Sequence, residues 1–159
     1  MIRIRRGGYI FFCGFIWLLI GFFLLVLGSK YILYSALLDG FDPSMNNFIK
    51  NLAVVTKGNE QAGVFLICIG LLIGYIIGKK SFSKSVAKII DRVDNHCLDK
   101  YSLFKIYSVR YWIILITFLF ICLYLQFYEI SHDLSGLINL IMGASLVNGS
   151  MHYFRSMFS

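Results

Sequence analysis

The chain has 159 residues, of which 58% are hydrophobic and 14% charged, and its mean hydropathy is +0.76. A soluble globular domain is nearer half apolar and a quarter charged, so this composition argues against one. It also excludes intrinsic disorder, collagen-like repeats and coiled coils, which need more polar, Gly-Pro or heptad content. The sequence therefore predicts an all-α integral membrane protein that forms a single membrane domain over residues 1–159.

Four uncharged stretches predict the membrane spans, at residues 7–29, 61–78, 111–128 and 134–154. Each is close to the roughly 20 apolar residues that a helix needs to cross a hydrocarbon core of about 30 Å. Transmembrane β-strands would instead alternate in polarity over about 10 residues. The first stretch follows a basic start, but it is too long for a signal peptide and no small-residue cleavage site follows it. We therefore expect an uncleaved anchor and a four-helix bundle.

The distribution of positive charge predicts a membrane protein with both termini in the cytoplasm. Lys30, Lys50 and Lys57 fall on one side of the predicted spans, and the other twelve of the fifteen Lys and Arg residues fall on the opposite side. Loops rich in Lys and Arg stay in the cytoplasm. Because this charge flanks the membrane, we expect membrane lipids, anionic on the cytoplasmic side, as partners and no nucleic acid.

Two connecting segments carry the pattern of a short amphipathic helix. In the outer one, Asp42-Pro43 predicts a helix start, Gly58 an end, and residues 45, 48, 49 and 52 an apolar face on the membrane surface. In the inner one, residues 86, 89, 90, 93 and 97 share an apolar face. This face is expected to pack on neighbouring helices, or alternatively to bind lipid or a partner. The basic residues expected to contact lipid phosphates are Lys79, Lys80, Lys84, Lys88 and Arg92.

Glycines recur at spacings that predict close helix packing. They stand at every seventh position in the first span, and in G-x-x-x-G order in the second. Small residues let membrane helices approach, because apolar contact alone gives little association in lipid. The third span has no glycine and is expected to face lipid. The helix-packing glycines of the other three spans are Gly7, Gly14, Gly21, Gly28, Gly63, Gly70, Gly74, Gly78, Gly136 and Gly143.

A polar stripe in the fourth span is the nearest approach to a site. Ser145, Asn148 and His152 lie at i, i+3 and i+7, so they share one helix face. Polar side chains in a membrane are costly unless they face protein, water or each other. The stripe predicts hydrogen bonds between helices or, as the alternative, the lining of an aqueous path.

The sequence predicts no catalytic residue, cofactor or metal site. No Lys, Arg, Asp or Glu falls inside a predicted span, which disfavours ion-coupled carriers and voltage sensors. The four Cys form no C-x-x-C pair, and the three His lack metal-ligand spacing. We therefore expect a non-enzymatic membrane protein, either a homo-oligomer or an accessory subunit of a membrane complex. A small channel or facilitator for a small solute is the alternative.

Three further stretches are Gly-Lys-Lys-Ser-Phe-Ser-Lys-Ser at 78–85, Tyr-Ser-Val-Arg-Tyr at 107–111, and the run from Asp133 through Met-Gly-Ala-Ser-Leu-Val-Asn-Gly-Ser to Tyr-Phe-Arg at 153–155. Together they resemble a family of uncharacterised four-helix bacterial membrane proteins from chlamydia-like organisms. The resemblance covers mainly the second half of the chain. It implies a four-span topology and an inner-membrane location, and no activity.

Overall fold

The computed structural model describes residues 6–37, 48–82, 86–88, 91, 117, 120, 124 and 131–157. Its elements in chain order are the helices α1 (Arg6–Leu37), α2 (Phe48–Thr56) and α3 (Asn59–Ile77), the π-helix η1 (Gly78–Phe82), and α7 (His132–Met157). The part of the chain described here is helical, as predicted, and contains no strand. Three of its helices, α1, α3 and α7, are long and apolar enough to cross a membrane. Of the predicted span at 111–128, all but residues 117, 120 and 124 lie outside the described part.

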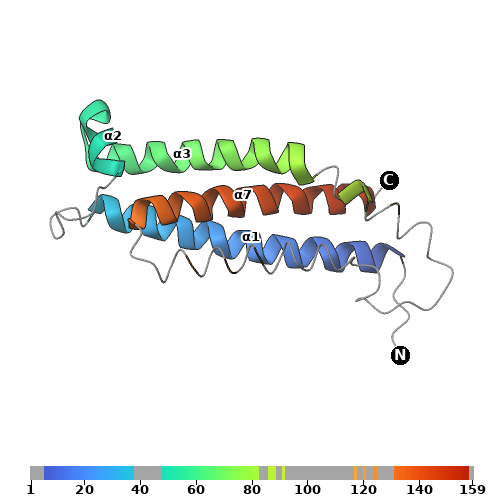
Figure 1. Cartoon of the computed structure of the whole chain (residues 1–159). Coiled ribbons are helices and arrows are strands. Elements are labelled where there is room, and N and C mark those ends of the chain that lie inside the picture. The colour runs from blue at the N-terminus through green and yellow to red at the C-terminus, as the bar shows by residue number, and fades with distance from the viewer. Residues whose placement is uncertain are drawn as a thin grey trace.

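Helix α7 lies between α1 and α3 (Figure 1). It runs antiparallel to α1, because Gly21 lies against Gly143 whereas Gly28 lies against Gly136. It runs parallel to α3, because Gly70 lies against Leu140 and the later Gly78 against Ser145. We call the end where α1 finishes and α3 and α7 begin the α2 end. The opposite end, which carries η1, is the η1 end.

The burial of the three long helices follows from this order. Inside the apolar window of α7, 56% of the residues are buried, against 33% in α1 and in α3. Near the α2 end, α1, α2, α3 and α7 share an apolar cluster that contains Ile32, Ile49, Leu66 and Leu140. A second cluster joins Trp17 and Leu24 of α1 to Leu146 of α7. The two outer helices therefore keep most of their apolar surface exposed.

Glycines bring the backbones of α1 and α7 into direct contact. A Cβ atom built on Gly21 would lie 2.9 Å from the carbonyl oxygen of Gly143, and one on Gly143 would lie 2.7 Å from that of Gly21. Gly28 and Gly136 face each other in the same reciprocal way, with distances of 2.7 and 2.9 Å. A seven-residue spacing keeps a residue type on one stripe of a helix that winds gently around its neighbour.

The glycines of α3 that face α7 are only four residues apart. Cβ atoms on Gly70, Gly74 and Gly78 would lie 2.6–2.8 Å from atoms of α7. Gly63 instead faces α1, where its Cβ would lie 3.0 Å from that of Ala36. Gly14 lies against Tyr153, whereas the side-chain surroundings of Gly7 in the first turn of α1 are outside the described part.

Helix α1 continues beyond the first predicted span, from Ser29 to Leu37. Lys30 does not end the helix, because its side chain points to the exposed surface. The following residues Ile32 and Ala36 are buried in the apolar cluster near the α2 end. Packing thus extends a helix beyond the stretch that hydrophobicity alone marks.

Helix α2 ends shortly before Gly58, where the sequence predicts its end. It stops at Thr56, and Lys57 rather than Gly58 takes the left-handed conformation, with φ 61°. Ile49 of the predicted apolar face is fully buried, but Phe48 is 49% exposed. Residues 42–47, including the expected helix start and residue 45, lie outside the described part. Through Ile49, α2 packs on the long helices.

The inner amphipathic segment is described at four positions. Val86 of its predicted apolar face is 2% exposed, whereas Lys88 and Asp91 are exposed. The burial of Val86 agrees with its place on the predicted apolar face. Lys84, Arg92 and the remaining residues of the predicted apolar face lie outside the described part.

Candidate functional site on α7 and at the η1 end

The predicted polar stripe of α7 is turned toward α3 and η1. Ser145 is buried, and its Oγ donates a hydrogen bond to the carbonyl oxygen of Met142, 2.8 Å away. Asn148 reaches across to α3, where its Nδ2 donates to the carbonyl oxygen of Tyr75 at 3.0 Å. His152 is partly buried one turn further on. Ser145 and Asn148 are thus engaged in hydrogen bonds within the protein.

The contact of Asn148 lies where α3 widens into the π-helix. The backbone N–H of Gly78, the first residue of η1, donates to the carbonyl oxygens of Gly74 and Tyr75. Asn148 donates to the same Tyr75 oxygen, and a Cβ on Gly78 would lie 3.0 Å from the Cβ of Asn148. A side chain that enters the backbone ladder is a recognised cause of helix distortion, and π-turns recur at functional sites. The stripe residue Asn148 therefore sits against the junction from which η1 starts.

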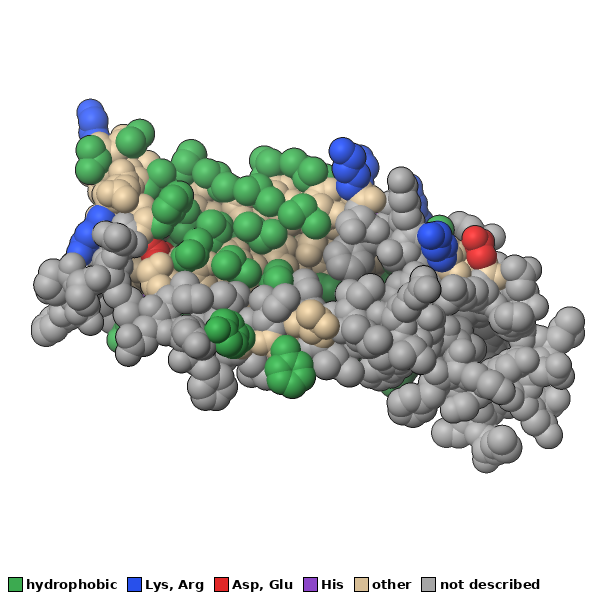
Figure 2. Space-filling view, viewed as in Figure 1, with side chains coloured by type: hydrophobic (Ala, Val, Ile, Leu, Met, Phe, Trp, Pro, Cys, Tyr) green, Lys and Arg blue, Asp and Glu red, His purple; other side chains and the backbone are tan. Residues whose placement is uncertain are grey.

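Two of the predicted lipid-contacting lysines lie on η1. Lys79 and Lys80 are both exposed, and Lys88 is exposed further along the chain. Figure 2 shows Lys and Arg side chains at the end of α3, next to hydrophobic side chains that cover its outer face. The exposed residues of that face nearest to η1 are Leu71, Leu72, Ile73, Tyr75, Ile76 and Ile77.

Helix α7 also buries polar side chains that the sequence analysis did not single out. Asn139 is 0% exposed, and neither its Nδ2 nor its Oδ1 has a hydrogen-bond partner among the described residues. Ser135 and Ser150 are buried as well, and Ser150 Oγ donates to the carbonyl oxygen of Val147 at 2.7 Å. The sequence could have pointed to Asn139, because it places a carboxamide in the middle of an uncharged span, where an unpaired polar group is costly.

Asp133, at the start of α7, holds α2 in place. One carboxylate oxygen, Oδ2, accepts a hydrogen bond of 3.1 Å from the backbone N–H of Ile49. The other, Oδ1, accepts one of 2.9 Å from the N–H of Leu134. A negative charge is favourable at a helix N-terminus, where backbone N–H groups lack helical partners. The buried carboxylate thus joins the first turns of two helices that are 84 residues apart in sequence.

Aromatic contacts join α1 to the beginning of α7. The ring of His132 stacks on Tyr31, with centroids 5.8 Å apart and planes 9° apart. It meets Tyr34 edge-on at 6.3 Å and 81°. Such offset and edge-to-face pairs add about 0.5–1.5 kcal/mol beyond apolar burial. These contacts give His132 a structural role at the α2 end.

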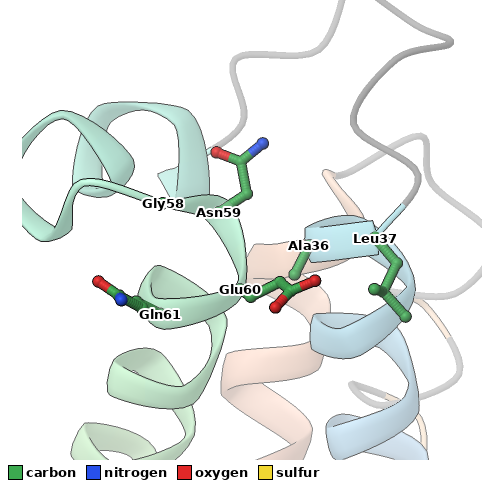
Figure 3. A pocket seen from close by; sticks show the side chains of 6 residues that line it. All are labelled: Ala36, Leu37, Gly58, Asn59, Glu60 and Gln61. Atoms are coloured by element: carbon green, nitrogen blue, oxygen red, sulfur yellow. The ribbon is translucent and has the colours of Figure 1, made fainter.

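A shallow open groove lies beside this end, between the last turn of α1 and the first turn of α3 (Figure 3). Its volume is about 410 Å³, and its lining residues are Ala36, Leu37, Gly58, Asn59, Glu60 and Gln61. In Figure 3 the Glu60 carboxylate is directed toward Ala36 and Leu37, whereas Gln61 turns away. Ligand pockets are more enclosed and bring several polar groups together. This groove therefore does not form a candidate ligand site.

Metal-binding clusters are also missing from the described residues, where no three His, Cys, Asp or Glu side chains come together. Cys13 is buried and Cys68 is exposed on α3. Comparisons with protein-family models, curated proteins and solved structures found no match to this chain. The proposals below therefore rest on the geometry of α7, α3 and η1.

Proposed function

We propose that this chain is a non-enzymatic, four-span membrane protein that acts as a packed helical subunit, either as a homo-oligomer or within a larger membrane complex. The observation that supports this function best is the engagement of Ser145 and Asn148 in hydrogen bonds with Met142 and Tyr75. These side chains were the candidates for the lining of a polar path. Asn148 instead joins α7 to α3, whereas Ser145 bonds to the backbone of its own helix.

The direction of the helices supports a fourth span. Helices α3 and α7 are parallel, so the last residue of η1 and the first of α7 lie at opposite ends of the molecule (Figure 1). The connection from Phe82 to His132 has to return over the whole length of α3. The uncharged stretch at 111–128 is long enough to do so as a helix within a membrane.

Positive charge supports an orientation with the η1 end in the cytoplasm. Lys79, Lys80 and Lys88 are the exposed basic residues described on η1 and beyond it, and α7 ends at the same side with Arg155 in its last turn. Both termini then lie in the cytoplasm of a bacterial inner membrane, in agreement with the positive-inside rule. The short helix α2 lies at the outer surface in this arrangement.

The exposed faces of α1 and α3 supply the surface for association. They display large hydrophobic side chains along their full lengths, among them Phe12, Phe22, Phe65 and Leu72. An apolar surface of this size is either covered by lipid tails or packed against other membrane helices. A second copy of the chain or another membrane subunit therefore has two faces on which to pack.

Light scattering and native mass spectrometry of the purified protein in mild detergent test this function. We expect a defined oligomer, and proteoliposomes that release a trapped small solute no faster than protein-free vesicles. A monomer that accelerates solute release would contradict the proposal. The two measurements separate a packing subunit from a transporter, because oligomer size and solute flux are independent.

Asn139 favours a second candidate, a small channel or facilitator along α7. Its buried amide has no hydrogen-bond partner among the described residues, and water would satisfy it if a narrow path ran beside it. Under this hypothesis, Asn139→Leu abolishes solute flux in proteoliposomes, whereas Asn148→Leu leaves it intact. An absence of flux in the unchanged protein removes this candidate.

A further inference from the structure

We propose that the π-helix η1 and the outer face of α3 together form a binding site for an anionic phospholipid, with the headgroup phosphate held by Lys79 and Lys80. This inference rests on the proposed membrane insertion and adds a specific ligand to it. Asn148 of α7 acts as the positioning residue of this site.

The apolar half of the site is a continuous line on α3. Cys68, Leu72 and Tyr75 are exposed at spacings of four and three residues, and Lys79 follows four residues later. Such spacings place side chains on one face of a helix. Tyr75 is 54% exposed one turn before the lysine. Tyrosine favours the membrane interface, where its ring is apolar and its hydroxyl is hydrated. The exposed line on α3 therefore runs from the charged Lys79 through the Tyr75 ring to apolar side chains. A phospholipid has the same order of charged headgroup, interfacial region and apolar tails.

The charged half owes its geometry to the π-turn. Gly78 lies so close to α7 that a Cβ would come within 2.8 Å of the carbonyl oxygen of Ser145. This contact holds the start of η1 against α7, and Asn148 donates to Tyr75 at the same junction. The widened turn that follows carries both Lys79 and Lys80 to the exposed surface. Lys79 and Lys80 are consecutive and both exposed, and basic residues at a membrane boundary attract anionic headgroups.

The opposite end of the molecule has a different arrangement of charge and provides the control. Lys30 and Lys57 are also exposed, but Lys30 lies on α1 and Lys57 in the turn between α2 and α3. Glu60 lies three residues after Lys57, and Asp133 is buried at the same end. Two lysines can therefore be neutralised at either end with the same change in net charge.

Native mass spectrometry of the full-length protein with phosphatidylglycerol and phosphatidylcholine at equal concentration tests the site. We expect the unchanged protein to retain phosphatidylglycerol preferentially. Each lysine attracts the anionic headgroup electrostatically. Because the double variant Lys79→Gln/Lys80→Gln loses both attractions, it should bind this lipid about 30-fold more weakly. The control variant Lys30→Gln/Lys57→Gln should keep the preference. Asn148→Ala should lower phosphatidylglycerol binding with both lysines present, and leave phosphatidylcholine binding unchanged.

Three results would overturn the proposal: equal retention of the two lipids by the unchanged protein, an equal loss in the control variant, or displacement of the lipid by inorganic phosphate at millimolar concentration. The last result would indicate a site for a free anion. Resistance of the protein to carbonate extraction from membranes is measured in parallel. A protein that stays in the membrane but shows no lipid preference contradicts only this inference, whereas a protein released by carbonate contradicts the proposed function itself.

Discussion

Two asparagines of α7 show how the same side chain acquires different roles. Asn148 has a partner in the carbonyl oxygen of Tyr75, 73 residues earlier in the sequence. Asn139 is completely buried, with no hydrogen-bond partner among the described residues. An interhelical hydrogen bond in a membrane protein contributes about 0.6 kcal/mol on average, whereas a buried unpaired amide costs about 1–3 kcal/mol. The two positions should therefore respond to the same substitution in opposite directions.

The first prediction is that Asn139→Leu raises the free energy of unfolding by about 1–3 kcal/mol. Asn148→Leu is the matched control and should lower it by about 0.6–1.7 kcal/mol, because the bond to Tyr75 is lost. Reversible unfolding in mixed detergent micelles measures both. A loss of stability in Asn139→Leu would show that the amide has a partner outside the described residues.

The second prediction concerns Lys57, which takes the left-handed backbone conformation that costs an L-residue about 1–2 kcal/mol. Lys57→Gly removes this cost at the expense of a more flexible unfolded chain, so we expect a net gain of about 0.5–1 kcal/mol. Lys50→Gly, inside α2, is the control and should lower stability by a similar amount. Thermal unfolding in detergent measures the difference, and a gain in both variants would argue against the backbone explanation.

The third prediction tests the contact of Asp133 with α2. Asp133→Ala leaves the N–H of Ile49 buried without its acceptor, which costs about 1–3 kcal/mol. Hydrogen exchange should then accelerate at Ile49 and the residues after it, while the centre of α3 stays protected. Unchanged exchange in α2 would mean that the burial of Ile49 alone holds this helix.

At the scale of the elements, glycine spacing decides which neighbour a helix can approach. Glycines seven residues apart in α1 face glycines seven residues apart in α7. The two backbones are in contact at both pairs, Gly21/Gly143 and Gly28/Gly136. The glycines of α3 that are four residues apart face side chains as well as backbone atoms of α7. Backbone atoms cannot rotate away from an added methyl group, whereas the end of a side chain can. The cost of a substitution therefore depends on which atom the glycine faces.

The fourth prediction compares two glycines of α3. A Cβ on Gly74 would lie 2.6 Å from the carbonyl oxygen of Ile141, whereas one on Gly70 would meet a methyl group of Leu140 at 2.7 Å. Gly74→Ala should therefore cost about 1–3 kcal/mol, and Gly70→Ala less, because Leu140 can change its rotamer. Unfolding in mixed micelles measures both free energies. Equal losses would mean that the Leu140 side chain is as rigid as the backbone.

At the scale of the whole molecule, three helices define two ends with different surfaces. The α2 end carries Lys57 and the buried Asp133, and the η1 end carries Lys79 and Lys80. The antiparallel pair α1 and α7 and the parallel pair α3 and α7 fix which residues share an end. If the molecule spans a membrane, the two ends face different compartments.

The fifth prediction follows from this separation. Lys57→Cys and Lys80→Cys are made in a background in which Cys13, Cys68, Cys97 and Cys122 are replaced by Ala. A membrane-impermeant maleimide should label position 57 in intact cells without an outer membrane, and position 80 only after the cells are opened. Labelling of both positions from one side would contradict the four-span topology.

The sequence by itself determined where the long helices lie. Uncharged stretches near 20 residues predicted α3 and α7 to within three residues at each end, because hydrophobic length is a local property. The first uncharged stretch, at 7–29, begins one residue after α1 does, and α1 continues eight residues beyond the end of that stretch. There, Ile32 and Ala36 continue the helix by packing on α2 and α3. Polarity within an apolar helix also marked Ser145 and Asn148 as candidate site residues.

The tertiary structure alone decided what these polar residues do. Whether an asparagine is paired depends on the register between α7 and α3, and no local pattern contains that register. The same register sets Asn148 against the start of η1. The packing of α2 on α7 brings Asp133 to Ile49 across 84 residues of chain. A hydrogen bond acts over about 3 Å, so small shifts between helices change its partner, whereas the hydrophobic effect depends on total buried area and tolerates them.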